Sequence, residues 1–343
     1  MSKIEYVLVT GATGYIGAHI VDELLRRGLR VRGTARSKDK ADEMLRARPQ
    51  FADRLDFAFV KDLTEPGGFG DAVKGVDAIM HTASPVDLDE SMDREKEIIL
   101  PAIRGTEAVL EAAKREPRVK RLVYTSSYAA VITASLLADP PAGLTFTAAD
   151  WNPITYDEGL SGPPILAYRV GKRDAEARAW RAVREENTHF DLVVLCPPLV
   201  FGPVAHPVAR TNALNSSVRG LWAVACGADP YPRVPTSVWV DVRDAAYAHV
   251  EALLRPEVGN TRFLLASPEP FSYQRAADVM REEFDWAKET VAKGTPGVPA
   301  PEWPKGDGKT VSEKLGFTYH TFRESVVDSI RQFKQIEERE KAV

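Results

Sequence analysis

The segment Tyr168-Arg169-Val170-Gly171-Lys172 places two chemically useful side chains four residues apart. On a helix this spacing puts both on one face, so the Tyr168 hydroxyl and the Lys172 ammonium should point to the same side. A neighbouring cation favours phenolate over phenol and is expected to lower the pKa of the tyrosine from its reference value near 10. Such a tyrosine would protonate a carbonyl oxygen at neutral pH. The alternative is a solvated surface pair, because Tyr-x-x-x-Lys is common on helices.

A serine pair stands where a second group for such chemistry would be needed. The apolar run 121–126 predicts a strand that ends in Thr125-Ser126-Ser127. A serine at the carboxyl end of a strand would hold a substrate carbonyl and share with the tyrosine the stabilisation of its developing negative charge. The alternative is that these serines cap a turn after the strand.

Three glycines near the start of the chain indicate dinucleotide chemistry. The run 7–10 is typical of a buried strand, Gly11, Gly14 and Gly17 follow it, and 15–28 has helical periodicity. Without side chains, the turn lets a pyrophosphate approach backbone N–H groups at the helix N-terminus, where the helix dipole favours negative charge. The spacing G-x-x-G-x-x-G departs from the general G-x-G-x-x-G fingerprint, so a glycine-rich turn of another α/β protein stays an alternative.

The elements that must position these groups alternate along the chain. The strands we predict are 5–10, 30–35, 56–60, 77–81, 121–126 and 190–196, and the helices are 15–28, 38–48, around 66–74, 92–115, 167–187 and 241–254. Such alternation predicts βαβ crossovers and a parallel sheet. The expected fold class is α/β, a Rossmann-type doubly wound parallel sheet with a smaller C-terminal substrate-binding lobe.

The same pattern predicts how the chain is divided. We expect a dinucleotide-binding domain over residues 1–197 together with 236–265, and a substrate-binding lobe over 198–235 and 266–335. The irregular stretches 130–165 and 198–238 should lie at the carboxyl edge of the sheet, where open α/β folds bind their ligands.

Composition excludes several classes of protein. The 343 residues are 44% hydrophobic and 27% charged, which is ordinary globular composition and argues against long disorder. A net charge of −4 gives no electrostatic reason to expect nucleic acid. No apolar run reaches the length of a membrane span, and the first strand begins too early for a signal peptide. Cys196 and Cys226, like the histidines, lack metal-ligand spacing. We therefore expect a cytoplasmic protein without a metal.

Taken in order, the motifs of this chain resemble the extended short-chain dehydrogenases/reductases. Within that superfamily they are similar to the dihydroflavonol-reductase-like group, which includes fungal and yeast NADPH-dependent aldehyde, methylglyoxal and ketone reductases. The matching segments are V-T-G-A-T-G-Y-I-G at 9–17, V-R-G-T-A-R at 31–36, Asp62-Leu63, H-T-A-S-P at 81–85, P-A-I-R-G-T at 101–106, Y-T-S-S at 124–127, Y-x-x-x-K at 168–172, P-P-L-V-F-G-P at 197–203 and V-D-V-R-D at 240–244. The last hundred residues match only through L-G-F at 315–317 and the final helix.

The resemblance implies a catalytic trio. Ser127 aligns with the catalytic serine, Tyr168 would be the acid, and Lys172 its partner and a donor to the nicotinamide ribose; Ser126 stays an alternative to Ser127. Pro101-Ala102 stands where many superfamily members carry a polar residue that completes a proton relay. Bulk water or ribose hydroxyls are therefore expected to supply the proton.

The end of the second strand favours NADPH over NADH. NAD sites usually place an acidic residue there to accept from the adenosine ribose. This strand ends in Arg36, with Lys38 and Lys40 following and Asp39 as the only nearby carboxylate. A guanidinium is a planar fork of donors suited to a 2′-phosphate. The alternative is that these cations form a solvated loop.

Further cofactor contacts follow from the resemblance. Asp62 would meet the adenine amino group, with a helix cap as its alternative. Ala83 and Ser84 would line the cofactor with their backbone, and the segment from Pro197 would pack against the nicotinamide. Ser216 would add a polar contact, again with a helix cap as the alternative. The predicted cofactor-binding residues are Gly11, Thr13, Gly14, Tyr15, Ile16, Gly17, Arg36, Lys40, Asp62, Leu63, Ala83, Ser84, Tyr168, Lys172, Pro197, Leu199, Val200 and Ser216.

The aromatic residues of the irregular segments predict a hydrophobic carbonyl substrate. They are Trp151, Phe201, Trp222, Tyr231 and Trp239. The alternative is that these rings belong to the hydrophobic core. For Asp241, Arg243 and Asp244, which open a helix, a cap and an ion-pair network are the better interpretation than catalysis.

The leading hypothesis is thus an NADPH-dependent reductase of aldehydes or ketones. Its alternatives are a nucleotide-sugar epimerase or dehydratase on the same scaffold and a non-catalytic dinucleotide sensor. The expected partner is a small carbonyl substrate. The sequence leaves a monomer and a homodimer open, because helices 92–115 and 167–187 would pair with a copy or face water.

Overall fold

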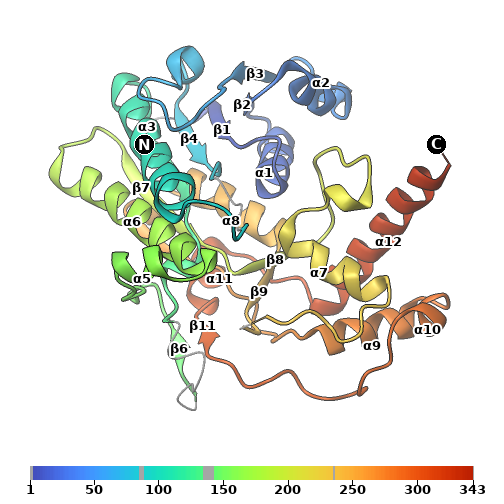
Figure 1. Ribbon diagram of the computed structural model, residues 1–343. Coiled ribbons are helices and arrows are strands. Elements are labelled where there is room, and N and C mark those ends of the chain that lie inside the picture. The colour runs from blue at the N-terminus through green and yellow to red at the C-terminus, as the bar shows by residue number, and fades with distance from the viewer. Residues whose placement is uncertain (1–2, 85–88, 134–142, 235, 343) are drawn as a thin grey trace.

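A seven-stranded parallel sheet forms the centre of the computed structural model, which describes residues 3–84, 89–133, 143–234 and 236–342 (Figure 1). The strand order is β10-β7-β5-β4-β1-β2-β3, and every neighbouring pair runs parallel. The strands are β1 (Tyr6–Thr10), β2 (Arg30–Ala35), β3 (Leu55–Phe59), β4 (Ala78–His81), β5 (Arg121–Thr125), β7 (Asp191–Cys196) and β10 (Thr261–Leu264). The expected doubly wound fold is confirmed; β10 is a strand that the sequence pattern did not predict.

Helices cover both faces of this sheet. They are α1 (Tyr15–Arg26), α2 (Lys38–Arg46), α3 (Leu100–Arg115), α5 (Tyr156–Ser161), α6 (Pro164–Glu185), α7 (Ser216–Ala225), α8 (Val242–Leu254), α9 (Tyr273–Glu283), α10 (Ala287–Thr290), α11 (Lys309–Leu315) and α12 (Phe322–Lys341). Since side chains alternate along a strand, Val7 and Val9 pack with α1 and α8, whereas Leu8 packs on the face that carries α3 and α6. None of the helices in the described residues is long and apolar enough to cross a membrane.

Two expected helices differ from the prediction. The stretch 66–74 contains only the 3-10 turn η2 (Gly70–Val73), because Gly67 and Gly70 adopt the left-handed φ values of +75° and +43°. The predicted helix 92–115 begins as the π-helical turn η3 (Arg94–Ile99), and α3 starts only at Leu100. Pro101 explains this break, because it has no N–H to donate into the preceding turn.

Small sheets connect the late segments to the core. β8 (Leu199–Phe201) pairs with β9 (Trp239–Asp241), and β6 (Thr145–Phe146) pairs with β11 (Lys305–Gly306). The helices α7, α9, α10 and α12 lie together on one side of the molecule (Figure 1). Residues of α7, α9 and α12 share one hydrophobic core with α1 and α8, so burial joins this lobe to the sheet.

The aromatic residues predicted to face a substrate mostly belong to these cores. Phe201 and Trp239 are fully buried and stack with ring centroids 6.1 Å apart. Trp222 packs against Phe333 at 6.2 Å, and the Tyr231 hydroxyl donates to the carbonyl of Ala292. Trp151 lies under the guanidinium of Arg262. The prediction that these rings surround a substrate was wrong for Phe201 and Trp239, because bringing the two small strands together buries both side chains.

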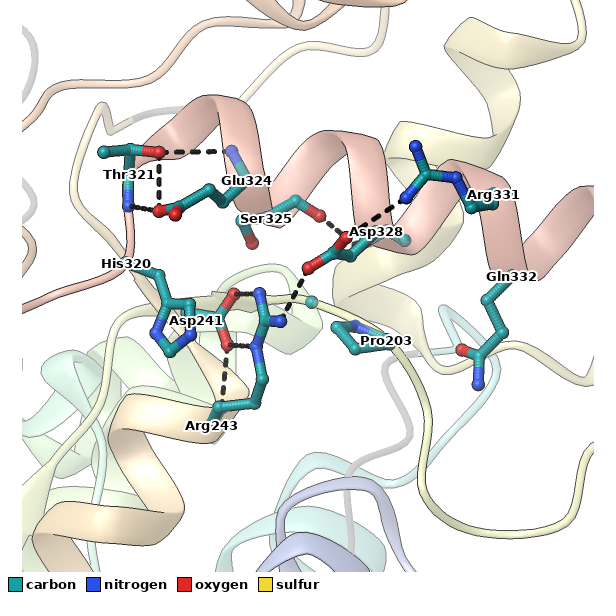
Figure 2. Close-up of polar contacts among 12 residues, drawn as sticks. Pro203, Asp241, Arg243, His320, Thr321, Glu324, Ser325, Asp328, Arg331 and Gln332 are labelled. Atoms are coloured by element: carbon teal, nitrogen blue, oxygen red, sulfur yellow. Dashed lines mark hydrogen bonds and ion pairs between the residues drawn. The ribbon is translucent and has the colours of Figure 1, made fainter.

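A network of charges ties α12 to the end of β9 and the start of α8 (Figure 2). Asp241 caps α8 and binds the Arg243 guanidinium, which also reaches Asp328 of α12 at 2.6 Å. Beside it, Asp244 pairs with His320 at 2.6 Å, and this hydrogen bond raises the pKa of the histidine above its usual value. The structural interpretation of the 241–244 segment is confirmed.

This network predicts a modest loss of stability when the carboxylate of Asp328 is neutralised. Asp328→Asn weakens the contact with Arg243, which keeps Asp241, so the free energy of unfolding should fall by about 1 kcal/mol. Urea unfolding measures this change. The control is Arg331→Gln, which removes the exposed partner of Asp328 at 3.7 Å and should leave the midpoint unchanged. Equal midpoints for Asp328→Asn and the wild type would contradict the prediction.

Candidate active site

The carboxyl ends of the parallel strands bring the predicted residues to one edge of the sheet. The strand order reverses between β1 and β4, which is the crevice where open α/β sheets bind ligands. The glycine turn follows β1, Thr82 to Ser84 follow β4, Ser126 and Ser127 follow β5, and Pro197 follows β7. Pro85, the last residue of the H-T-A-S-P segment, lies outside the described residues.

Each of the three glycines suits its position for a different physical reason. Gly11 has a φ of +68°, and the Gly14 N–H donates to its carbonyl at 2.9 Å, which closes the turn. A Cβ atom on Gly17 would stand 2.1 Å from the Gly11 carbonyl oxygen, so only glycine lets α1 approach the turn. Gly14 is the N-cap of α1, and no side chain caps it. The turn therefore leaves the positive end of α1 uncovered by side chains of its own helix.

Tyr168 and Ser127 face each other across the edge. The Tyr168 hydroxyl lies 3.4 Å from Ser127 Oγ, and both side chains are half-buried. Ser126 points elsewhere, because its hydroxyl donates to Glu176 Oε2 at 2.6 Å and is buried. Ser127 also accepts the Ala129 N–H as the cap of a short turn, so the capping role and the contact with tyrosine hold together.

Lys172 lies on the same helix face, one turn after the tyrosine. Its side chain is 5% exposed, and its ammonium lies 5.9 Å from the centre of the Tyr168 ring. Among the residues that the structure describes, the ammonium has no hydrogen bond or ion-pair partner. Burial lowers the pKa of Lys172 to about 8.

The pKa of Tyr168 departs from the expectation. The nearby lysine was expected to lower it, but burial raises the pKa of Tyr168 above its usual value, and the hydrogen bond with Ser127 offsets only part of that rise. The expectation was wrong because the spacing on a helix says which groups are neighbours, whereas the degree of burial comes from the surrounding fold. The tyrosine is therefore held in its protonated form, which is the form a proton donor needs.

The residues predicted to bind the adenosine end of the cofactor lie at the edge of the sheet near β2 and β3. Arg36 is exposed and makes no ion pair within the described parts of the chain. Lys40 pairs with Glu43 on the exposed face of α2 at 2.8 Å. Asp62 accepts the N–H and hydroxyl of Thr64, both at 2.7 Å. The alternative of a helix cap for Asp62 was wrong, because no helix begins at this point.

Several other residues that were predicted to bind the cofactor make contacts within the protein. The Tyr15 hydroxyl donates to the Gly202 carbonyl at 2.7 Å, and the Ala83 N–H donates to Thr10 Oγ1. The carbonyl of Pro197 accepts the Tyr128 N–H, and Val200 is buried in the core. The rest lie at the same edge: Thr13 and Leu199 are half-buried, Ile16 and Leu63 pack on the cores, and Ser216 is exposed at the start of α7. Ser84 has a partner as well.

The residues at this edge fit NADPH. An uncapped helix N-terminus, a guanidinium at Arg36 without an ion pair and the ammonium of the buried Lys172 side chain are the donors that pyrophosphate, a 2′-phosphate and ribose hydroxyls need. Asn215 adds an orphaned acceptor, because its Oδ1 is buried without a partner among the described residues and does not cap α7.

Sequence reasoning missed the groups behind Ser127 and Tyr168. Glu176 is fully buried between Ser126 and Arg262; its own position is typical of an ordinary helix charge, and the strand that carries Arg262 was not predicted. One signal was present, since Glu176 stands at i+4 from Lys172 and so shares its helix face.

Comparisons with known proteins agree with this geometry. A family model described as the NAD dependent epimerase/dehydratase family matches residues 7–266. A putative uncharacterized oxidoreductase of Schizosaccharomyces pombe is 38% identical over 330 residues, 95% of this chain and 96% of its own. A putative NADPH-dependent methylglyoxal reductase of Candida albicans is 37% identical over 348 residues, 97% of this chain and 99% of its own. The crystal structure of yeast methylglyoxal/isovaleraldehyde reductase complexed with NADPH has a TM-score of 0.89 at 30% identity and covers 97% of this chain and 99% of that chain.

Proposed function

The chain belongs to the NAD dependent epimerase/dehydratase family, and we propose that within it this protein is an NADPH-dependent carbonyl reductase that converts aldehydes and ketones, ketoesters included, to alcohols. One observation supports this most: a protonated tyrosine, a serine hydroxyl and a buried, unpaired ammonium converge at the crevice of a doubly wound sheet. This set of groups suits the reduction of a carbonyl group, because donors and a cation stabilise the negative charge that develops on the carbonyl oxygen.

Each of the three residues has one task in the proposed reaction. NADPH supplies the hydride. Ser127 and Tyr168 donate to the carbonyl oxygen, and Tyr168 then transfers its proton to that oxygen as the alcohol forms. Lys172, held close to the ring, stabilises the tyrosinate that remains and donates to the ribose. Solvent returns the proton to Tyr168, because Pro101-Ala102 offers no side-chain donor for a relay.

The test follows NADPH oxidation at 340 nm with aldehydes, α-ketoesters and aryl ketones, and repeats each assay with NADH. We expect substrate-dependent oxidation of NADPH and much slower oxidation of NADH. Arg36→Ala should raise the KM for NADPH about 10- to 100-fold and leave the KM for NADH unchanged, because only NADPH carries the 2′-phosphate. Equal effects on both cofactors would reject the role of Arg36, and no oxidation with any carbonyl would reject the proposed function.

The proposed role of Lys172 predicts a pH dependence. Burial lowers its pKa to about 8, so the stabilising cation is present below that pH and is lost as the pH rises through it. Since Tyr168 has a raised pKa and stays protonated there, we expect kcat/KM to fall about tenfold per pH unit above about pH 8. NADPH fluorescence titrations over the same range serve as the control for binding. A kcat/KM that stays constant into the alkaline range would contradict this role.

The alternatives from the sequence have weaker support. The nucleotide-sugar enzymes among similar structures, such as one in complex with UDP-glucose and NAD, are only 21% identical and share the fold alone. An intact Ser127, Tyr168 and Lys172 argues against a non-catalytic sensor. We further propose a cytoplasmic location, which two free cysteines favour, and residues 198–235 and 266–335 as the lobe that binds the substrate.

A further inference from the structure

The buried carboxylate of Glu176 has no part in the proposed reaction, yet it lies directly behind the reacting groups. It stands four residues after Lys172 and eight after Tyr168 on α6, and its side chain is 0% exposed. Ser126 Oγ donates to its Oε2 at 2.6 Å, and Arg262 Nε donates to its Oε1 at 2.6 Å. The carboxylate therefore joins α6 to the end of β5 and to β10.

Arg262 extends this contact to a loop. Its Nη1 donates to the backbone carbonyls of Ala148 at 2.9 Å and Asp150 at 2.5 Å. Its guanidinium also lies over the ring of Trp151, 4.1 Å from the centroid. Glu176 thus holds the loop 148–151 in place through Arg262.

The same loop returns to the catalytic serine. Asn152 donates its backbone N–H to Ala130 and its side-chain amide to the carbonyl of Ala129, each at 2.9 Å. The Ala129 N–H in turn donates to Ser127 Oγ at 3.1 Å. The contacts that start at Glu176 therefore reach Ser127 from both sides: through Ser126 directly, and through the loop.

The geometry explains why such a support matters. Ser127 follows β5 whereas Tyr168 belongs to α6, and their 3.4 Å separation is near the limit of a hydrogen bond. In the described residues, the only other side-chain hydrogen bond between segment 121–130 and α6 is the one from Ser126 to Glu176. A small shift of α6 against β5 would separate the two reacting hydroxyls.

We propose that Glu176 is a positioning residue, which holds the Ser126–Ser127 turn against α6 so that Ser127 and Tyr168 engage the same carbonyl oxygen. This inference rests on the proposed reduction of a carbonyl group. A purely structural role would explain the Glu176–Arg262 pair less well, because buried ion pairs contribute little net stability over apolar packing. The structure instead attaches Glu176 to the turn that carries Ser127, and Arg262 to the loop 148–151.

Ser126→Ala tests the proposal, because it removes one hydroxyl and leaves Glu176 bound to Arg262. We expect kcat to fall about tenfold, with the KM for NADPH unchanged and the urea midpoint lowered, because the buried Glu176 loses one donor. In crystal structures of both proteins, the distance from Ser127 Oγ to Tyr168 Oη should lengthen beyond hydrogen-bond reach in the variant. The matched control is Trp180→Phe, which removes another donor to Glu176, at 3.1 Å, on the side away from the turn. This control should lower the urea midpoint and keep the wild-type kcat.

The outcomes separate the two proposals. A Ser126→Ala variant with wild-type kcat and an unchanged distance would overturn the positioning role, and so would a Trp180→Phe variant with an equal loss of kcat. The crystallographic distance needs no turnover. A wild-type protein that reduces no carbonyl would therefore reject the proposed function, while the distance would still decide whether Glu176 positions Ser127.

Discussion

Replacing Tyr168 by phenylalanine is expected to lower kcat about 10³-fold, because general acid catalysis contributes about 10²- to 10⁴-fold. The variant removes one oxygen atom and keeps the ring that packs beside Lys172. Removal of the hydroxyl leaves a carbonyl oxygen with Ser127 as its only side-chain donor and without a source of the proton. Steady-state assays with saturating NADPH and the best carbonyl substrate measure the loss.

Two controls make this result specific. NADPH affinity, followed by fluorescence, should stay at the wild-type value, because the hydroxyl contacts Ser127 and the ring is retained. Tyr156→Phe removes another helical tyrosine hydroxyl, which donates to Glu95, and is expected to retain activity. If Tyr168→Phe keeps near-native turnover, the tyrosine is not the acid.

Replacing Gly17 by alanine is expected to have the second large effect, on the fold. Its Cβ atom would stand 2.1 Å from the carbonyl oxygen of Gly11 and 2.8 Å from the carbonyl carbon, both of them backbone atoms. Neither moves without opening the turn between β1 and α1. We expect a loss of about 3 kcal/mol in the free energy of unfolding, at the upper end of typical overpacking costs. Urea unfolding measures the change.

Gly14→Ala is the matched substitution in the same turn. Gly14 has an ordinary φ of −91°, and its Cβ atom would stand 3.2 Å from the Gly11 carbonyl oxygen. We expect a much smaller loss of stability and a weaker affinity for NADPH, because this methyl group would stand where a pyrophosphate approaches the helix. If both variants lose only stability, or both lose only affinity, the separate roles of the two glycines are wrong.

Much of this site could be predicted because short local patterns in the sequence identify its residues. A strand, a glycine turn and a helix follow one another within residues 6–26, and the carboxyl ends of parallel strands must meet at one edge. The four-residue spacing of Tyr168 and Lys172 likewise determines a shared helix face. The sequence leaves the choice between Ser126 and Ser127 open, because the direction of a side chain after a strand depends on what packs behind it.

By itself, the sequence determined six of the seven strands of the central sheet, most of the helices between them, the glycine turn and the groups that stand at the edge, since each depends mainly on residues close in the chain. Only the tertiary structure decided how deeply Tyr168 is buried, and therefore the direction of its pKa. It also decided that Glu176 meets Arg262, 86 residues later, and that Trp239 lies in the core. These depend on partners distant in sequence, whose contact and burial arise only when the sheet and the late segments pack together.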